Sequence, residues 1–230
     1  MIRITAIAGH YGSGKTEFSV NLALDLKKEK DKVAILDMDI ANPYFRSRER
    51  QKMMEAEGIN VIFNTYGFDI TEDLPAITAA LRGPLENEEF TAVVDVGGND
   101  SGARVLKQFE KYFRRDDCEL LCVLNANRPE TDTVEGMLEH LHSIEIETGL
   151  KFQGIINNTH LLRETTADDI VKGYKLCRQV SDKLGIPIVW NTCREDLLDD
   201  LKQLIADENI EGLENIYPIK LYMRPSWLDR

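Results

Sequence analysis

Short apolar runs alternate with amphipathic stretches along this chain. The runs are rich in β-branched residues, which is typical of strands buried on both faces. The stretches between them repeat apolar residues at the three- and four-residue spacing of a helix packed on one side. The expected strands lie at 2–8, 32–37, 59–63, 90–96, 119–124, 152–157 and 186–190, and the expected helices at 15–29, 45–56, 72–82, 101–113, 131–147, 165–184 and 196–207.

This alternation predicts an α/β fold, with a mostly parallel sheet of about seven strands and helices on both faces. The 230 residues suffice for one such domain. No linker, internal repeat or low-complexity tract divides them, so we expect a single domain over 1–230, with 208–230 as a non-helical C-terminal extension. In such sheets ligands bind outside the carboxyl ends of the strands, and the polar residues directly after each run are therefore the functional candidates.

The extension contains an aromatic stretch over 217–227 that is broken by Pro218 and Pro225. Two prolines prevent it from forming an amphipathic membrane helix. We expect it to pack back over its own domain. The alternative is a partner surface, because Tyr, Met, Arg and Trp are common at interfaces.

The first apolar run leads directly into residues 9–16, Gly-His-Tyr-Gly-Ser-Gly-Lys-Thr, which fit the phosphate-binding pattern GxxxxGK[ST]. In this motif glycines let successive backbone N–H groups point at phosphate oxygens, Lys15 reaches the outer phosphates, and the Thr16 hydroxyl ligates magnesium. The loop also starts a helix, whose dipole favours anions. The sequence therefore predicts a bound nucleoside triphosphate with Mg²⁺, held by Gly9, Tyr11, Gly12, Ser13, Gly14, Lys15, Thr16 and Glu17.

Acidic residues end two further runs. The second run ends in Asp37-Met38-Asp39 and the fourth in Asp95-Val96-Gly97-Gly98. A carboxylate at the tip of an apolar strand beside a phosphate loop is placed to hold the metal, which makes Asp39 and Asp95 candidates together with the threonine of the loop. Gly98 lets the backbone approach the terminal phosphate, so loss of that phosphate could release this segment. A plain acidic turn is the alternative for both segments.

Taken together, the phosphate loop and these two segments resemble the MinD/ParA group of P-loop ATPases. The broad class includes nitrogenase iron protein, dethiobiotin synthetase and the glutamine-dependent cobyrinic acid a,c-diamide synthases. The resemblance spans roughly residues 1–200 and implies the three-layer P-loop NTPase fold. It also implies that Lys15 and Thr16 bind phosphate and magnesium, that Asp39 orients the attacking water, and that Asp95 supports the metal.

The expected base is adenine. Guanine-specific loops use NKxD, which this chain lacks, and ATP is therefore favoured over GTP. The resemblance places Asn157 where this group reads the adenine. An Asn side chain can accept from the adenine amino group while it donates to a ring nitrogen. A turn after the strand is the alternative role for both Asn157 and Asn158.

The phosphate loop departs from the group at its second residue, and the segment Trp190–Glu195 lacks the proline that is common beside the base in MinD-like proteins. MinD/ParA loops usually carry a lysine after the first glycine, which reaches the partner's phosphates across a dimer, whereas this chain has His10. A largely neutral imidazole is a poor substitute for an ammonium group. Nucleotide-dependent homodimerisation coupled to hydrolysis would then need an arginine instead. The candidates are Arg46, Arg48, Arg104 and Arg128, and each has a solvated surface position as its alternative.

Composition and charge limit the binding partners and the cellular location that we expect for this protein. The formal net charge of −12 disfavours sequence-independent binding to nucleic acid or anionic lipid, since both need clustered Lys and Arg. We expect neither a signal peptide nor a membrane span, hence a cytoplasmic protein. The four cysteines, Cys118, Cys122, Cys177 and Cys193, form no CxxC pair and are expected to be reduced. Cys118 and Cys122 share one face of a strand and should pack as small hydrophobes.

The leading functional hypothesis is a Mg²⁺-dependent ATPase of MinD/ParA type, with Lys15, Asp39 and Asp95 in the catalytic site. ATP hydrolysis would drive a conformational or dimerisation switch on a protein partner. The alternative is an ATP-dependent enzyme that activates a carboxylate, related to dethiobiotin synthetase or cobyrinic acid a,c-diamide synthase. A subunit that binds nucleotide without hydrolysing it is the third option.

Overall fold

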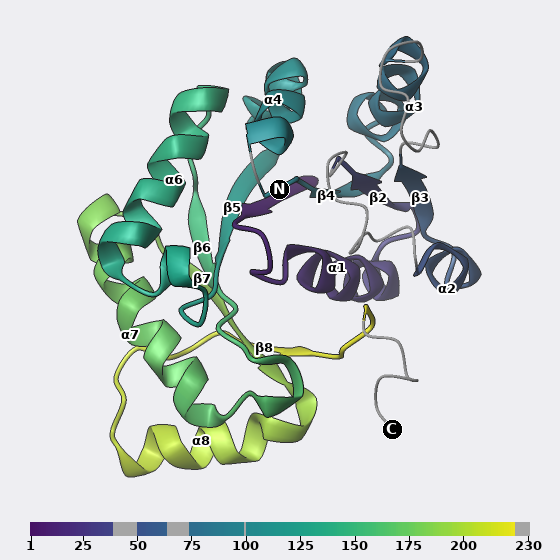
Figure 1. The fold of residues 1–230 in the computed structure, drawn as a ribbon. Helices are drawn as coiled ribbons and strands as arrows, with labels where there is room; N and C mark the ends of the chain where they lie inside the picture. Colours follow the sequence, from purple (N-terminus) through teal and green to yellow (C-terminus); the bar gives the residue numbers. More distant parts are fainter. Residues whose placement is uncertain (39–49, 64–73, 99, 224–230) are drawn as a thin grey trace.

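The computed structural model describes residues 1–38, 50–63, 74–98 and 100–223. In these ranges eight strands form one sheet in the order β3-β2-β4-β1-β5-β6-β7-β8, as Figure 1 shows. Every neighbouring pair is parallel. The strands are β1 Ile4–Gly9, β2 Val33–Asp37, β3 Asn60–Phe63, β4 Thr91–Asp95, β5 Cys118–Leu124, β6 Gly154–Asn157, β7 Ile188–Arg194 and β8 Ile216–Ile219.

The predicted α/β fold with a parallel sheet is confirmed, and each of the seven expected strands is present. The sequence did not indicate the eighth strand. Among the described strands β8 pairs with β7 alone, at the edge of the sheet, and it contains Pro218. An edge strand tolerates proline because the side of the strand that faces no neighbour needs no N–H donor.

Helices cover both faces of the sheet (Figure 1). α1 and α2 share one buried cluster with the sheet, and α3 to α6 share another, which also takes in the middle of α7. α8 packs on α7 and β7. The α-helices are α1 Lys15–Glu29, α2 Gln51–Ala56, α3 Leu74–Glu86, α4 Asp100–Gln108, α5 Glu110–Phe113, α6 Val134–Thr148, α7 Ala167–Leu184 and α8 Leu198–Asp207, and short 3₁₀ helices lie at Pro129–Thr131, Leu162–Glu164 and Glu195–Leu197.

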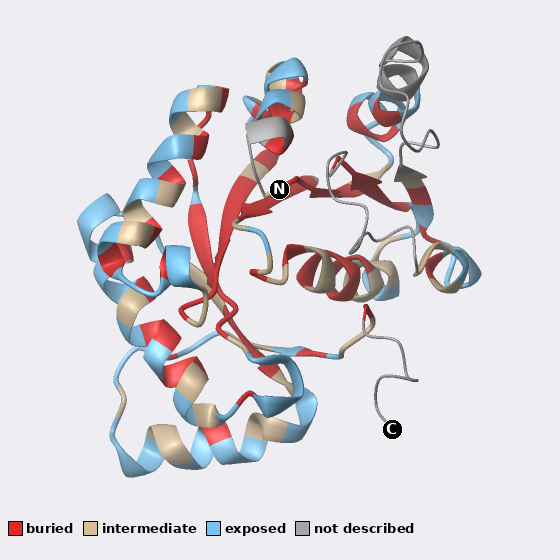
Figure 2. Cartoon of the chain, viewed as in Figure 1, coloured by how far each residue is buried: buried red, intermediate tan, exposed pale blue. Residues whose placement is uncertain are grey.

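The central strand β1 supplies side chains to both layers. Ile4, Ala6 and Ala8 face the cluster under α3 to α6, whereas Ile7 faces α1. Successive side chains of a strand point to opposite faces, so a strand between two layers of helices is apolar on both faces over most of its length. Figure 2 shows the buried residues concentrated in the strands and on the helix sides that face them.

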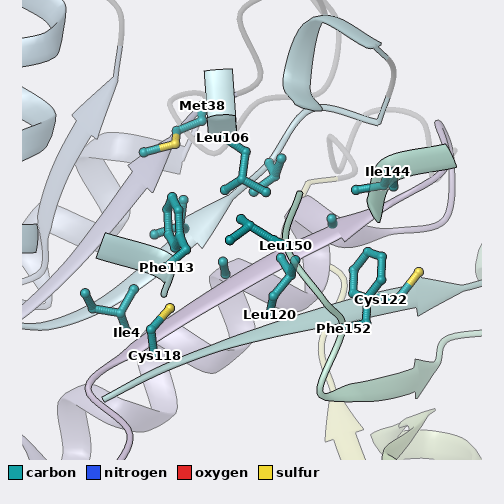
Figure 3. Packing of buried hydrophobic residues seen from close by; sticks show 14 of the residues in the cluster. Ile4, Met38, Leu106, Phe113, Cys118, Leu120, Cys122, Ile144, Leu150 and Phe152 are labelled. Atoms are coloured by element: carbon teal, nitrogen blue, oxygen red, sulfur yellow. The ribbon is translucent and has the colours of Figure 1, made fainter. Parts of the chain in front are cut away.

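The first cluster also contains Cys118 and Cys122 of β5, two residues labelled in Figure 3. Their predicted packing as small hydrophobes is confirmed. Burial raises the pKa of the Cys118 thiol to about 12, so this group stays protonated at neutral pH. All four cysteines are free and buried.

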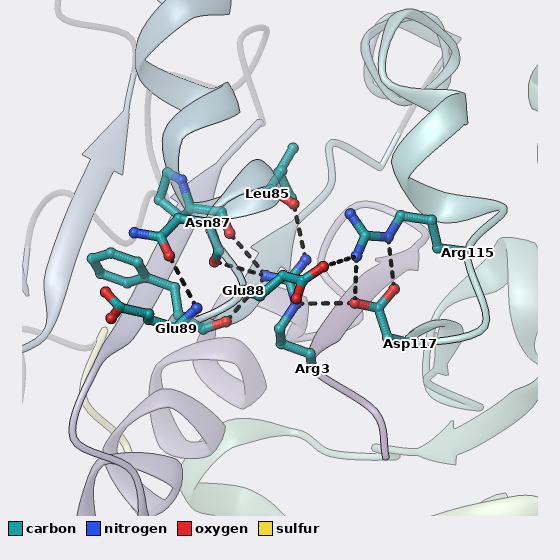
Figure 4. Close-up of polar contacts among 9 residues, drawn as sticks. Arg3, Leu85, Asn87, Glu88, Glu89, Arg115 and Asp117 are labelled. Atoms are coloured by element: carbon teal, nitrogen blue, oxygen red, sulfur yellow. Dashed lines mark hydrogen bonds and ion pairs between the residues drawn. The ribbon is translucent and has the colours of Figure 1, made fainter.

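Arg3 joins distant segments at the edge of the sheet opposite the carboxyl ends of the strands (Figure 4). Its Nε donates to Asp117 Oδ2 at 2.9 Å, and its Nη atoms donate to backbone carbonyls between residues 84 and 90. Arg115 donates to the same Asp117 carboxylate at 2.9 and 3.0 Å. The two guanidinium groups lower the pKa of Asp117, although partial burial opposes them. This network fixes the end of α3 against the start of β5.

Candidate functional site

A cavity of about 510 Å³ opens at the carboxyl edge of the sheet. Its walls come from the loop of residues 9–16, the first turn of α1, the loop after β6, the end of β7 and the segment 219–223. This is the edge at which parallel α/β sheets bind ligands. A cavity of this volume accommodates a small molecule or cofactor.

Glycines give the loop its shape. Gly12 and Gly14 have φ angles of 73° and 86°, in the region that favours glycine. A Cβ on Gly14 would lie 2.2 Å from Asn158 Nδ2, and one on Gly9 would lie 2.3 Å from the Val123 carbonyl oxygen. The loop is thus tightly seated against β5 and the segment after β6. α1 begins directly after Gly14, and no side chain caps it, which suits an anion.

The segment after β4 packs directly against the phosphate loop, with Gly98 beside Lys15. Lys15 is 6% exposed, and its Nζ donates to the His10 carbonyl oxygen at 3.1 Å. A Cβ on Gly98 would lie 2.8 Å from Lys15 Nζ and 2.8 Å from the Tyr11 backbone nitrogen. Only glycine lets the segment after β4 approach the loop this closely.

Asp95 is buried at the end of β4, beside Asp37 at the end of β2. The two positions are direct partners across the parallel pair, so their carboxylates lie on the same side of the sheet. Two neighbouring buried carboxylates repel each other, and a cation bound between them stabilises their charged forms. Thr16 lines the cavity and adds a hydroxyl. Asp39, the other predicted carboxylate, lies outside the described residues.

These oxygen donors fit Mg²⁺, which is usually held by one or two protein carboxylates together with phosphate oxygens and water. Thr16 and Asp95 are the residues that would hold it. Among the described residues no cluster of three or more His, Cys, Asp or Glu side chains is placed to bind a metal. Magnesium bound with a nucleotide does not need such a cluster, since the phosphates supply ligands.

The two asparagines after β6 have different positions. Asn157 is fully buried, and its Nδ2 donates to the Ile170 carbonyl and to Asn191 Oδ1, both at 3.0 Å. Asn158 lines the cavity and donates to the Ser13 carbonyl at 2.7 Å. The structure therefore places Asn158 beside the phosphate loop and Asn157 in the scaffold that joins β6 to α7 and β7.

The His10 ring lies beside a backbone carbonyl and the carboxylate of Glu130. Its Nδ1 lies 3.1 Å from the Tyr11 carbonyl oxygen and 3.8 Å from Glu130 Oε2. Among the four candidate arginines, Arg128 lines the cavity and donates from Nε to the Gly12 carbonyl at 2.9 Å. Arg104 is exposed on α4. Arg46 and Arg48 lie outside the described residues.

Sequence reasoning placed the C-terminal segment over its own domain but did not assign it to the site. Glu17, Asn21 and Asp25, one helical turn apart on α1, hold this segment in place. Asn21 exchanges two hydrogen bonds of 2.9 Å with the Lys220 backbone, and Asp25 accepts from the Tyr217 hydroxyl at 2.6 Å.

Glu17 accepts from the backbone N–H groups of Tyr222 and Met223. Burial raises the pKa of Glu17 to about 7, and the two N–H donors oppose this rise. Glu17 was predicted to contact the cofactor. The structure places it at the cavity wall and at the C-terminal segment simultaneously. In the sequence, the signal that could have pointed to this contact is the spacing of four between polar residues on an otherwise buried face of the helix.

No helix in the described part of the chain is long and apolar enough to cross a membrane. Solved structures of similar fold include cell division protein FtsY from Thermotoga maritima (23% identity, TM-score 0.53, 82% of this chain and 60% of that chain). Others are chloroplast FtsY from Physcomitrella patens (21%, 0.55, 82% and 57%) and the signal recognition particle 54 kDa protein from Aeropyrum pernix in complex with GDP (21%, 0.55, 81% and 40%). This chain spans 60% or less of their lengths, and at these identities the likeness shows the fold alone.

The sequence itself gives a more specific relationship. Residues 4–207 match the CbiA family, described as the CobQ/CobB/MinD/ParA nucleotide binding domain. The matched range runs from β1 to the end of α8 and includes the phosphate loop, the end of β4 and the loop after β6. The chain therefore belongs to the CobQ/CobB/MinD/ParA family of P-loop nucleotide-binding domains.

Proposed function

We propose that this chain binds ATP with Mg²⁺ in the cavity and hydrolyses it, and that loss of the γ-phosphate changes the segment after β4. The observation that carries the proposal is the contact of Gly98 with Lys15 and Tyr11. A terminal phosphate bound by Lys15 would lie against this segment, so the presence of the phosphate can be transmitted to the start of α4. The family match supports nucleotide binding.

The proposed roles follow from position. Lys15 and the backbone amides of the loop stabilise the negative charge that shifts among the phosphate oxygens during transfer. Thr16 and Asp95 hold Mg²⁺, which would supply further charge stabilisation when bound. For Asp39 the proposed role rests on the sequence resemblance alone, which implies that it orients the water that attacks the γ-phosphate in line. The resulting change at Gly98 would act on a second copy of the chain or on another protein.

A carboxylate-activating enzyme is the second candidate. The residue at position 10 favours this candidate, because the lysine that would reach a partner's phosphates is replaced by His10. The His10 ring lies beside Glu130 and a backbone carbonyl. Such an enzyme would use ATP to phosphorylate a small acid. The CobQ and CobB names in the family description are compatible with this chemistry.

Two measurements test the proposal. Lys15→Ala should abolish triphosphate binding in calorimetry with ATP and Mg²⁺, and retained micromolar affinity would reject the loop as the site. The exposed Lys28 of α1, changed to Ala, is the matched control and should bind as the unaltered protein does. GTP, measured in parallel, tests whether the site prefers adenine over guanine.

Light scattering without nucleotide, with ADP and with a non-hydrolysable ATP analogue separates the two candidates. Dimerisation with the ATP analogue alone would support the switch. An unchanged mass in all three states would favour the carboxylate-activating enzyme, and phosphate release would then be measured with small carboxylic acids as co-substrates.

A further inference from the structure

Arg128 lies against the phosphate loop, and no ion pair joins it to another described residue. Its Nε donates to the Gly12 carbonyl at 2.9 Å, and a Cβ on Gly12 would lie 2.9 Å from Arg128 Cζ and 3.0 Å from Nη2. The guanidinium group thus covers the face of Gly12. No carboxylate among the described residues forms an ion pair with it.

Two further cationic side chains line the cavity in the described part of the chain. In the described part of the chain, Lys15, Arg128 and Arg194 are the lysine and arginine residues that line it. Lys15 donates to the His10 carbonyl. Arg194 is paired with Asp196 at 2.9 Å and also donates to the Leu162 carbonyl at 2.9 Å. Asp196 thus neutralises Arg194, whereas no carboxylate among the described residues forms an ion pair with Arg128.

The backbone around Arg128 is held in place. Asn125 bonds through its side chain to both the N–H and the carbonyl of His160, at 3.2 Å each. Thr131 donates its hydroxyl to the Asn125 carbonyl at 2.7 Å and its backbone N–H to the Arg128 carbonyl at 2.9 Å. These bonds tie the loop after β5 to the loop after β6 and fix the backbone that carries Arg128. The bond of its Nε to the Gly12 carbonyl then orients the guanidinium group at the phosphate loop.

We propose that Arg128 is a second phosphate-binding cation, which contacts the phosphate chain of the nucleotide from within the same chain. This inference rests on the proposed nucleotide site. A nucleoside triphosphate carries several negative charges, and the loop of residues 9–16 supplies a single lysine. Arginine suits the task because Nε can hold the Gly12 carbonyl while the Nη groups remain available to phosphate oxygens. Arg128 thereby sets the preference of the site for phosphorylated ligands over the bare nucleoside.

The test is nucleotide affinity as a function of the number of phosphates. Calorimetry with ATP, ADP, AMP and adenosine would be performed on the unaltered protein, Arg128→Gln, Arg128→Lys and the control Arg82→Gln, whose side chain is exposed on α3. For Arg128→Gln we expect about a 10- to 100-fold loss for ATP and ADP and no change for adenosine. Arg128→Lys keeps the charge and should recover part of the loss. The dependence of the Kd for ATP on salt should weaken in Arg128→Gln.

The outcomes distinguish a failure of the proposed nucleotide binding from a failure of the role proposed for Arg128. If the unaltered protein binds no triphosphate, the proposed function fails whatever Arg128 does. If it binds ATP and Arg128→Gln loses ATP and adenosine affinity equally, with a lower Tm, Arg128 only supports the loop, and the inference is overturned. Unchanged ATP affinity in a folded Arg128→Gln protein would also overturn it.

Discussion

The carboxylate of Glu17 accepts hydrogen bonds from the Met223 backbone N–H at 3.1 and 3.2 Å, across a sequence separation of 206 residues. Glu17 directly follows Thr16, the expected magnesium ligand, and Met223 lines the same cavity. The bond therefore connects the start of α1 to the wall formed by the C-terminal segment. Both ends of the described chain take part in building the site.

Removing this carboxylate should release the segment. Glu17→Ala leaves buried N–H groups without their acceptor, and we expect a loss of about 1–3 kcal/mol in the free energy of unfolding. Cleavage by protease near residue 220 should become faster than in the unaltered protein. Urea unfolding and limited proteolysis measure the two effects. The exposed Glu29→Ala on the same helix is the control, and equal behaviour of both variants would contradict the assigned role.

A methyl group at Gly98 should impair binding of the terminal phosphate. In Gly98→Ala the new Cβ would lie within 2.8 Å of Lys15 Nζ, so the lysine or the segment must move. We expect the Kd for ATP to rise about tenfold or more, and that for ADP to rise less. Gly83→Ala in α3 is the control, because a Cβ on Gly83 would meet no atom within 4 Å. Equal losses for ATP and ADP would argue against a γ-phosphate contact.

Acid should destabilise the protein through His140. Burial lowers the pKa of this imidazole to about 4 from an ordinary value of 6.5, with smaller contributions from His10 and Lys15. A base with a lowered pKa stabilises the fold above its unfolded pKa and loses that contribution as the pH falls through 6.5 toward 4. The loss amounts to about 3 kcal/mol.

Unfolding curves at pH 7, 5.5 and 4.5 test this pH dependence. His140→Gln should flatten the decline, whereas His142→Gln, at an exposed position of the same helix, should leave it as it is. His160, whose pKa burial also lowers to about 4, contributes a decline of its own in both variants. An unchanged decline in His140→Gln would show that its titration is not linked to unfolding.

Arg3 should contribute to the stability of the fold and not to the affinity for the nucleotide. Arg3→Ala removes bonds to the Asp117 carboxylate and to two backbone carbonyls in the last turn of α3, and it leaves some of these acceptors without a donor. We expect a loss of about 2–4 kcal/mol in the free energy of unfolding, with an unchanged Kd for ATP below the Tm. A changed Kd would mean that this end of the sheet is coupled to the cavity.

Sequence reasoning was most successful where the pattern is local. The apolar run before residues 9–16 predicted β1, the loop and α1, and these lie where the motif requires them. It did not distinguish the surroundings of Asn157 and Asn158, because two adjacent asparagines look alike in the sequence, whereas their side chains point to different sides of the strand end. The edge strand β8 was not predicted, because Ile216–Ile219 is short and contains a proline.

By itself, the sequence determined the parallel sheet, the phosphate loop and the family, because each depends on residues that are close together in the chain. Only the tertiary structure decided that Asn158 faces the cavity, that Arg128 covers Gly12 and that the C-terminal segment forms a wall. These contacts join residues more than a hundred positions apart. Their geometry depends on the order of strands in the sheet, and short-range patterns of hydrophobicity do not specify that order.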